Sequence, residues 1–361
     1  YIINCDLKQG ANVGMALLIR ANEVNGMLSM QQAIEAVEAG FREFGLNPEL
    51  KAPRRRIMTP DGVRVSVHPG GVPSLGGIGL LTHAEHVAVS KEVQTYHSMG
   101  GPVTVLFDVK DASLMAILVG RVGLVELPAE RPTPIRTAAT SAVGTRWLAR
   151  EDSKVLGIIG AGGEAKYHLL AFSKIRQFSL AKVYCRTEST RLEFCRVMHK
   201  LVPFEVRSVS RAREAIAGSD VVLTATNSNV PVFDGAWLEP GTHVTSIMGG
   251  NIGLGKAGIA QSKRRERDDT SIRRSDVIVV NSRDQAIQDE QGDLYDPVQA
   301  GFLSWDRVGE LGDLLNGKIP GRSGAQQITL FKNNAGQGVA DVAIACKLYT
   351  LARARDLGVE F

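Results

Sequence analysis

The chain has 361 residues, of which 44% are apolar and 22% charged, and its net charge is +4. This length suggests two domains or one large one, and the charge suits a small anionic ligand but is too small to indicate nucleic acid. Cys5, Cys185, Cys195 and Cys346 show no metal-binding spacing, so we expect no metal site and a reducing, cytoplasmic compartment. No apolar run is long enough for a membrane span, and a targeting segment before Tyr1 stays possible.

The first third of the chain predicts a helix and then strands. Residues 29–44 carry apolar side chains at helical spacing, and Ser29 with Gln32 forms a capping box. Residues 63–67 alternate valine with polar residues, which predicts a strand. The glycine-rich segment 69–79 predicts a loop near a ligand or a tight approach between strands.

The middle of the chain predicts a hairpin and then a parallel sheet. Residues 103–109 and 113–119 flank a short polar turn, which favours a β-hairpin. After residue 154, β-branched runs alternate with helical stretches, a pattern typical of a parallel sheet covered on both faces. The runs are KVLGII, KVYC, FEVRSV, VVLTAT, HVTSIM and DVIVV. A last helix, through residues 340–351, is expected to pack on the N-terminal part.

A densely charged segment, SKRRERDDTSIRR, covers residues 262–274. A phosphate or nucleic-acid patch is one interpretation. Acidic and basic residues interleave, however, and mixed charge is typical of solvated helices. We therefore expect a surface helix here.

The segment VLGIIGAGGEAKYHLLAF (155–172) predicts a strand, a turn and a helix. Its turn fits the pattern G-x-G-x-x-[G/A], in which glycines allow a tight bend and let a pyrophosphate approach the helix N-terminus. A turn of this kind without a ligand is the alternative. The residues expected to bind the cofactor are Gly160, Ala161, Gly162, Gly163 and Glu164.

The end of the next predicted strand bears on the choice of cofactor. An enzyme that prefers NAD usually has an acidic residue there for the ribose 2′-hydroxyl. This chain has Arg186 and Thr187 instead, and no acid before Glu188. Both residues could hold a 2′-phosphate, so we expect NADP(H) to be preferred over NAD(H).

The segment RPTPIRTAATSAVGTRWLAR (131–150) predicts a helix capped by Thr133, with Pro134 at its first position. Arg136 then lies in the first turn, where the helix dipole disfavours a cation. An arginine there favours an anion such as a carboxylate, bound by charge-assisted hydrogen bonds. The alternative is a salt bridge to a nearby acid such as Glu130.

These motifs resemble the ornithine cyclodeaminase/mu-crystallin family, and the resemblance covers nearly the whole chain. It implies an α/β fold with a Rossmann domain and an α+β domain for substrate binding and dimerisation, built from the N- and C-terminal segments. We place the latter at 1–133 and 322–361 and the Rossmann domain at 134–321, and we expect a homodimer. The motifs are IRTAATSAVGTRWLA (135–149), GIIGAGGEAKYH (157–168), TATNSNVPVFDGAWLEPGTHV (224–244), RSDVIVVNS (274–282), EQGDL (290–294) and QITLFKNN (327–334).

The resemblance also implies roles for particular residues. Arg136 matches the arginine that binds the substrate carboxylate, and Arg54 matches a second arginine of that pocket. The residues expected to flank the nicotinamide are Thr226, Asn227, Ser228, Met248 and Gly249.

Three departures from the family's pattern bear on the chemistry. Gly79 stands where a lysine commonly reaches the substrate, and Val65 stands where the cyclodeaminase branch has a glutamate. Ser228 stands where that branch has a catalytic aspartate, and serine is too weak an acid or base to replace it. His83 and His86 then become the first candidates for a proton donor.

The sequence therefore predicts an NAD(P)H-dependent reductase or dehydrogenase acting on a small imino acid, keto acid or amino acid. In such an enzyme the chain supplies a carboxylate clamp and orientation, and the cofactor carries the hydride. The first alternative is a redox-neutral, ornithine-type cyclodeaminase. The second is a non-catalytic NADPH-dependent binding protein.

Overall fold

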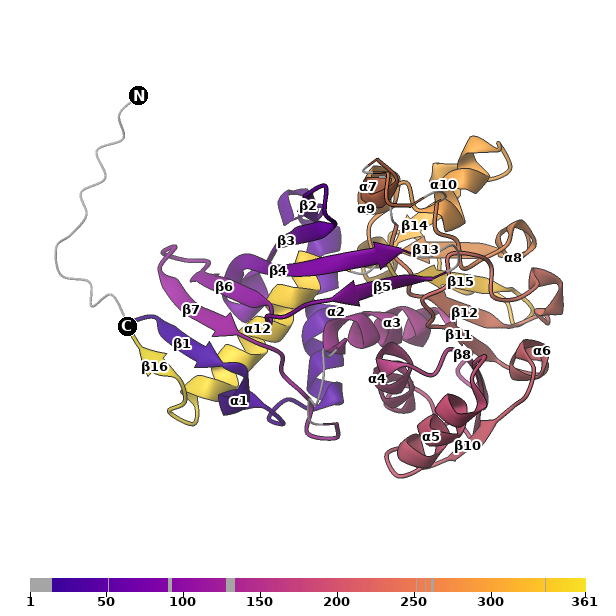
Figure 1. Ribbon diagram of the computed structural model, residues 1–361, viewed down its shortest axis with the longest axis horizontal. Coiled ribbons are helices and arrows are strands. Elements are labelled where there is room, and N and C mark those ends of the chain that lie inside the picture. Colours follow the sequence, from indigo (N-terminus) through magenta and orange to yellow (C-terminus); the bar gives the residue numbers. More distant parts are fainter. Residues whose placement is uncertain are drawn as a thin grey trace.

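The computed structural model describes residues 15–50, 52–89, 93–127, 134–250, 252–256, 258–260, 263–334 and 336–361. Two eight-stranded sheets lie at opposite ends of the molecule, with helix α3 (Ile135–Leu148) between them (Figure 1). The N- and C-terminal parts of the described chain meet in the first sheet, whereas the second contains strands from the middle of the chain. The predicted α/β class with a Rossmann-type domain is confirmed.

The first sheet is mixed, and the predicted hairpin is confirmed as β6 and β7, which pair antiparallel. Strand β5 pairs with β4, beside the main path of the sheet. In spatial order the strands are β16 (Val359–Glu360), β1 (Leu17–Arg20), β7 (Leu114–Val119), β6 (Val103–Asp108), β4 (Gly77–Val89), β3 (Val63–Val72) and β2 (Arg55–Met58), with β5 at Gln94–His97.

Helices α2 (Met30–Leu46) and α12 (Gly338–Arg353) pack against each other and against this sheet. The Ser29 capping box that begins α2 is confirmed, and α12 packs on the N-terminal part as expected. The loop predicted over residues 69–79 is wrong, since β3 and β4 run through it and turn at Pro73–Leu75. The alternative, a tight approach between strands, is correct, because a Cβ on Gly79 of β4 would lie 1.9 Å from the carbonyl oxygen of Val105 on β6.

Strand β3 buries its polar side chains and exposes its apolar ones, the reverse of a usual half-buried strand. Its polar residues Arg64, Ser66 and His68 are buried, whereas Val63 is exposed and Val65 is half-buried. The alternation thus predicted the strand correctly, but the polar side faces inward.

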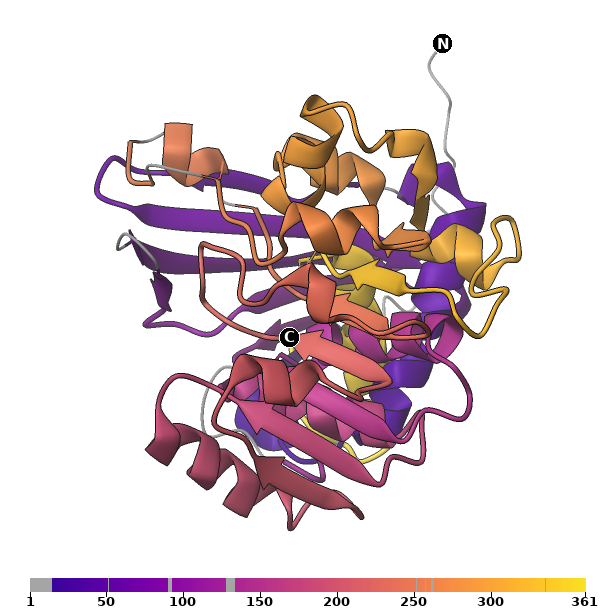
Figure 2. The ribbon, with the colours of Figure 1, turned by 90° about the vertical axis from the view of Figure 1, so that its right-hand side faces the viewer.

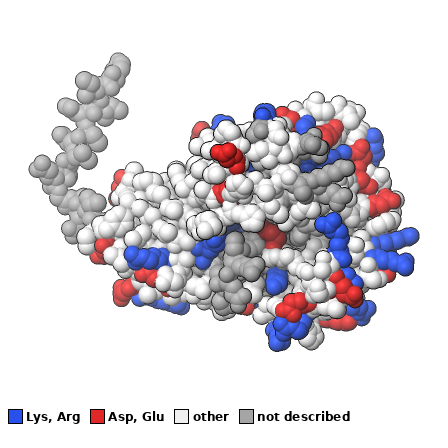
Figure 3. Space-filling model, viewed as in Figure 1, with Lys and Arg blue, Asp and Glu red and all other residues white. Residues whose placement is uncertain are grey.

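The other face of the first sheet exposes apolar side chains. Ile57, Ile78, Phe107 and Val119 are 36% to 73% exposed on four strands of the sheet. On the side shown in Figure 3, charged side chains are sparse over much of this sheet and more frequent over the second part of the molecule.

The second sheet is parallel throughout, and all six predicted strands are present. Strand order reverses between β8 and β11, the position where open α/β sheets bind ligands. Figure 2, in which this part faces the viewer, shows helices around the sheet. In spatial order the strands are β10 (Glu205–Ser208), β9 (Leu180–Tyr184), β8 (Val155–Ile159), β11 (Val221–Thr224), β12 (His243–Ser246), β15 (Thr329–Lys332), β13 (Val277–Val280) and β14 (Val308–Glu310).

The remaining helices are mostly short and connect these strands. They are α1 (Ala21–Val24), α4 (Gly163–Ser173), α5 (Glu188–Met198), α6 (Ala212–Ile216), α7 (Ile252–Lys256), α8 (Asp269–Arg273), α9 (Arg283–Gln288), α10 (Gly292–Gln299) and α11 (Leu311–Leu315), with 3-10 turns at Pro48–Leu50, Pro73–Leu75, Gly235–Trp237 and Trp305–Arg307. Within the part of the chain that the structure describes, no helix combines the length and the apolar character that a bilayer crossing requires.

Strand β15 corrects the expected domain boundary. It pairs with β12 and β13 in the second sheet, so a boundary at residue 322 would separate it from its hydrogen-bonded neighbours. The sheet therefore requires the C-terminal segment of the first domain to begin after Lys332. The division itself stays a prediction, with α3 at its junction.

Helix α3 joins the two parts through small residues. A Cβ on Gly144 would lie 2.5 Å from the Phe331 ring of β15, so the helix and that strand approach closely. Its start differs slightly from the prediction, because Pro134 is the N-cap and the helix begins at Ile135. Thr133, the predicted cap, lies outside the described residues.

Candidate active site

The glycine-rich turn lies between β8 and α4, at the point where the strand order reverses. Gly160 has a φ of 113°, and a Cβ there would lie 2.1 Å from the carbonyl oxygen of Ala225, so only glycine fits. No atom lies within 4 Å of a Cβ built on Gly162 or Gly163. Gly162 is the N-cap of α4, whose first N–H groups have no intrahelical acceptor, and the turn therefore fits a pyrophosphate.

Arg186 and Thr187 are both exposed where β9 leads into α5, and Thr187 is the N-cap of that helix. A cavity of about 320 Å³ lies next to this region. Sequence reasoning missed most of its lining, although a basic residue and two hydroxyls near the first turns of two helices are a readable signal. The lining residues are Ala161, Lys166, Ser189, Thr190, Glu193 and Phe194.

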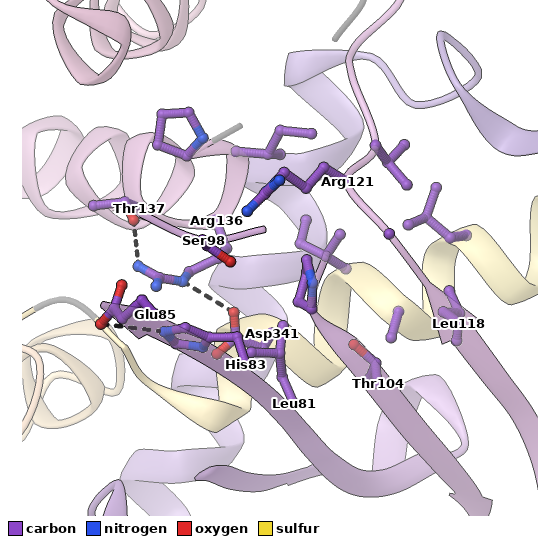
Figure 4. A pocket seen from close by; sticks show the side chains of 18 of the residues that line it. Leu81, His83, Glu85, Ser98, Thr104, Leu118, Arg121, Arg136, Thr137 and Asp341 are labelled. Carbon is purple, nitrogen blue, oxygen red and sulfur yellow. Dashed lines mark hydrogen bonds and ion pairs between the residues drawn. The ribbon is translucent and has the colours of Figure 1, made fainter. Parts of the chain in front are cut away.

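A second cavity, of about 510 Å³, lies where the first sheet, α3, α4 and α12 meet. Arg136 points into it from the first turn of α3, as the sequence predicted (Figure 4). The opposite wall is formed by Leu81, His83 and Glu85, which project from the same side of β4.

Arg136 is held by neighbours on two helices. Its Nε donates to Oδ1 of Asp341 on α12 at 2.9 Å, and its Nη1 donates to the hydroxyl of Thr137 (Figure 4). The predicted alternative of an ion pair is thus met by Asp341, while Glu130 lies outside the described residues. The Arg136 side chain remains 25% exposed, so part of the guanidinium faces the cavity.

Asp341 also binds His68, whose Nδ1 lies 2.9 Å from its Oδ2. Burial raises the pKa of Asp341, but Arg136 and His68 outweigh burial and hold that pKa below its ordinary value. Burial lowers the pKa of His68 to about 4. The hydrogen bond and charge of Asp341 raise this pKa, whereas the charges of Arg136 and Arg54 lower it further. Sequence reasoning did not rank His68, since its pairing with Asp341 spans most of the chain.

The two histidines ranked as proton donors lie on opposite sides of β4. His83 lines the cavity, with its Nε2 3.7 Å from Glu85. His86 faces the other way, is exposed and pairs with Val63 of β3. The placement of His86 contradicts its expected role and separates the two rings. Among the described residues, no group of three His, Cys, Asp or Glu side chains is arranged to hold a metal ion.

Glu164 has a different position from the one expected. Glu164 lies in the first turn of α4, next to the glycine-rich turn, and it also lines the cavity together with Arg136. The side chain is 44% exposed, but Oε2 is buried and has no hydrogen-bond partner among the described residues. Burial raises the pKa of Glu164 to about 7, although the charge of Arg136 partly opposes this.

Arg54 lies behind the cavity and is fully buried. Its guanidinium pairs with Asp289 and donates to the carbonyl oxygen of Asn334 at 3.2 Å. It is not among the described lining residues, but its Nη2 lies 3.5 Å from where a Cβ on Gly249 would be. The structure therefore places Arg54 beside the end of β12, with much of its charge compensated by Asp289.

Gly79 lies on the same side of β4 as the cavity wall, two residues before Leu81. A Cβ built on it would be 1.9 Å from the carbonyl oxygen of Val105 on β6. The backbone at this position therefore accepts glycine and excludes a side chain of any length.

The other residues expected at the nicotinamide lie at the ends of β11 and β12. Thr226, Asn227 and Ser228 follow β11, whereas Met248 and Gly249 follow β12. The carboxyl ends of both strands lie at the edge of the sheet where parallel sheets bind ligands. Their arrangement fits a nicotinamide, but the hydroxyl of Ser228 donates to the carbonyl oxygen of Val230 within its own loop.

The loop after β11 is held by Arg264, which is buried. Its guanidinium donates to the carbonyl oxygens of Ser228 and Thr226, at 3.0 and 3.1 Å. It also reaches the hydroxyl of Tyr96, which lines the cavity, at 3.4 Å. One side chain thus connects the loop to the first sheet.

The charged segment 262–274 is not a solvated helix, which corrects the expectation. Glu266 is fully buried and accepts hydrogen bonds from the hydroxyls of Thr224, Thr226 and Ser246. It also accepts from the backbone N–H of Thr226. The buried charges of Arg264 and Glu266 have hydrogen-bond partners inside the protein. Only residues Asp269–Arg273 of the segment form a helix, the short α8.

A buried ion pair completes this network. Lys332, at the end of β15, lies 2.8 Å from Asp293 and donates to Ser246 at 3.2 Å. Asp293 in turn accepts from the backbone N–H groups of Glu266 and Arg267. Asp293 and Lys332 lie in the motifs EQGDL and QITLFKNN, to which no role was assigned from the sequence. The signal for Lys332 is its place as a single charged residue directly after the apolar run TLF.

The parallel sheet and its glycine-rich turn define a dinucleotide-binding protein, and a cavity lined in part by Arg136 adjoins the turn. The profile of the ornithine cyclodeaminase/mu-crystallin family matches residues 15–356, and the chain belongs to this family.

The chain is similar to reductases named for pyrroline-carboxylate and ketimine substrates. A Δ1-pyrroline-2-carboxylate reductase of Bacillus cereus is 29% identical over 349 residues, which cover 96% of this chain and 100% of that protein. The ketimine reductase mu-crystallin of Mus musculus is 29% identical over 341 residues, covering 92% and 96% of the two chains. The structure of Δ1-pyrroline-2-carboxylate reductase from Thermococcus litoralis, in complex with NADH and L-proline, has a TM-score of 0.78 and 28% identity, covering 96% of this chain and 100% of that one.

Proposed function

We propose that the protein is an NAD(P)H-dependent reductase that acts on a small imino acid, keto acid or amino acid, with cyclic imino acids as its first substrate class. The observation that carries the proposal is Arg136, which faces a cavity adjoining the dinucleotide turn. The similarity to pyrroline-carboxylate and ketimine reductases supports the same class.

The chain's own residues would bind and orient the substrate. A bound reduced nicotinamide supplies a hydride for the C=N or C=O carbon. Arg136, fixed by Asp341 and Thr137, would hold the substrate carboxylate through its remaining N–H groups. The apolar residues Leu118 and Ile344 would cover the rest of the substrate and exclude water.

The direct test is a cofactor-oxidation assay with Δ1-pyrroline-2-carboxylate, pyruvate, and pyruvate plus an amine. Changing Arg136 to Ala should lower kcat/KM for carboxylate substrates about a hundredfold, because a charge-assisted contact is lost. Arg207→Ala, on the exposed strand β10, is the matched control and should not change it. Unchanged kinetics of the Arg136 variant on a confirmed substrate would remove this arginine from the site.

Cyclodeamination is the weaker candidate. It needs a carboxylate to manage a second amine, but Ser228 stands at the expected position and its hydroxyl is engaged with Val230. Incubation with ornithine and catalytic NAD, followed by assays for ammonia and proline, tests this reaction. A purely binding role predicts that NADPH binds tightly but is oxidised with none of the three substrate classes.

We propose NADP(H) as the preferred cofactor and a reducing, cytoplasmic compartment. Arg186 and Thr187 stand where an acidic residue would favour NAD, and this supports the cofactor preference. The free thiols of Cys185, Cys195 and Cys346 support the compartment.

We also propose that two copies associate through the exposed face of the first sheet. Contiguous exposed apolar side chains are typical of interfaces, and Ile78 and Phe107 lie directly opposite each other on the adjacent strands β4 and β6 of this face. The wild type should elute as a dimer in size-exclusion chromatography with light scattering, and Ile78→Asp should shift it toward monomer. Ile287→Asp, at an exposed position of α9, should remain dimeric. A monomeric wild type would refute the dimer.

A further inference from the structure

Arg121 is a second arginine of the cavity that contains Arg136. It follows β7, directly after Gly120, whose backbone N–H donates to the carbonyl oxygen of Pro102 at 2.9 Å. Its side chain points into the same cavity as that of Arg136 (Figure 4). The residue is half-buried, so a molecule in the cavity can reach it.

The guanidinium of Arg121 has no partner. Within the described part of the chain its side chain forms no hydrogen bond and no ion pair, whereas Arg136 is paired with Asp341 at 2.9 Å. The two arginines therefore differ in charge balance, because only the charge of Arg136 is compensated by a carboxylate of the protein.

The other carboxyl groups of the cavity do not supply the missing charge. Glu85 is paired with Arg64, and although burial raises its pKa, His83 and Arg64 outweigh burial and lower that pKa to about 2. Burial raises the pKa of Glu164 to about 7, so this group is only partly ionised at neutral pH. The charge of Arg121 is thus left over, and a guanidinium that faces a cavity favours an anion.

The cavity wall between β4 and β7 is a row of three side chains. Leu81 of β4, Thr104 of β6 and Leu118 of β7 are paired in register, and all three line the cavity. Thr104 is 7% exposed, and its hydroxyl has no hydrogen-bond partner among the described residues. An unpaired hydroxyl in the cavity wall is a further polar group that a ligand can use.

The two arginines are anchored toward different ends of this row. At the β4 end, Leu81 pairs in register with His68, and Asp341 joins that histidine to Arg136. At the other end, Arg121 follows β7. Strand β6 lies between β4 and β7, and neighbouring strands are about 4.8 Å apart, so the row is about 10 Å long. A ligand that contacts both guanidiniums therefore needs two anionic groups several bonds apart.

Resting on the proposed function, we infer that Arg121 binds a second carboxylate of the substrate, which makes the substrate an imino or keto dicarboxylate, cyclic or open-chain. Arg136 would hold the carboxylate next to the reacting carbon, and Arg121 would hold the distal one through charge-assisted hydrogen bonds. The cavity of about 510 Å³ has room for such a ligand. A monocarboxylate would leave the charge of Arg121 unpaired.

The test uses pairs of amino acids with the same shape and different charge, L-glutamate with L-glutamine and L-aspartate with L-asparagine. Each is titrated calorimetrically into the protein saturated with NADP⁺, because amino acids stand on the product side of the reduction. In at least one pair the wild type should bind the acid about tenfold more tightly than its amide, as expected for one charge-assisted contact. Arg121→Met, which keeps a long side chain without charge, should abolish this preference, and Arg121→Lys should retain part of it.

Arg213→Met, at an exposed position of α6, is the matched control and should keep the wild-type preference. Arg136→Met should weaken the acid and the amide alike, since both carry the carboxylate next to the amine. Thermal unfolding checks that each variant is folded. Equal affinity of the wild type for acid and amide in both pairs, or a folded Arg121→Met variant that keeps the preference, overturns the inference. If the acid is preferred but NADPH is oxidised with no imino or keto acid, the proposed function fails and the anion site at Arg121 stands.

Discussion

Arg186 is exposed where β9 meets α5, beside the hydroxyl of Thr187 and the cavity that contains Lys166. A 2′-phosphate bound there would form charge-assisted hydrogen bonds with the guanidinium. Arg186→Ala should therefore weaken NADPH binding about tenfold or more and leave NADH binding nearly unchanged.

Fluorescence titration of both cofactors measures this change, with Arg207→Ala on exposed β10 as the control. Equal losses for the two cofactors would contradict a specific phosphate contact at Arg186. Tighter binding of NADH than of NADPH by the wild type would reject the proposed preference.

Among the elements, the loop after β11 depends on Glu266 for its position. This carboxylate joins the ends of β11 and β12 through Thr224, Thr226 and Ser246, directly beneath the residues expected at the nicotinamide. Replacing it with glutamine keeps the size but removes the charge and turns two donors toward a cluster of hydroxyls. We expect the free energy of unfolding to fall by about 2 kcal/mol and the affinity for the cofactor to decrease.

Denaturant unfolding and cofactor titration measure the two effects. Glu205→Gln, on the exposed β10, is the control and should change stability by less than about 0.5 kcal/mol. If Glu266→Gln lowered stability without affecting the cofactor, the network would be structural and would not position the loop.

At the scale of the whole molecule, three buried histidines should make the fold sensitive to acid. Burial lowers the pKa of His68 and that of His168 to about 4, and it places the pKa of His243 well below its ordinary value. In the unfolded chain each would titrate near 6.5. Below that pH the unfolded chain binds protons that the folded chain rejects, so stability falls from about pH 6.5 toward pH 4.

For His168 the pKa difference corresponds to a loss of about 3 kcal/mol, complete near pH 4. Glu164 acts in the opposite direction, because its raised pKa adds stability below about pH 7, but its side chain is partly exposed and contributes less. Urea unfolding at pH 7.5, 6.0 and 5.0 should show this decline, and His168→Gln should reduce its slope. A constant free energy over this range would show that the buried histidines are not neutral as described.

Much of the site was readable from local sequence. The turn at Gly160 follows from short-range rules, since only glycine fits its backbone and an apolar strand precedes it. Arg136 was readable because its place in a helix's first turn is unfavourable without an anion. The resemblance to the family identified the anion expected at Arg136 as a substrate carboxylate. The match over residues 15–356 confirms the family, and the role of Arg136 stays a prediction.

The sequence by itself determined the strands of the parallel sheet, the dinucleotide turn and the place of Arg136 in a helix's first turn, because these depend on neighbours within a few residues. Only the tertiary structure decided that His83 faces the cavity and His86 does not, that Glu266 is buried, and that Asp341 joins Arg136 to His68. The reason is physical: a charged or polar side chain can be buried wherever a partner compensates it, and that partner comes from a distant part of the chain.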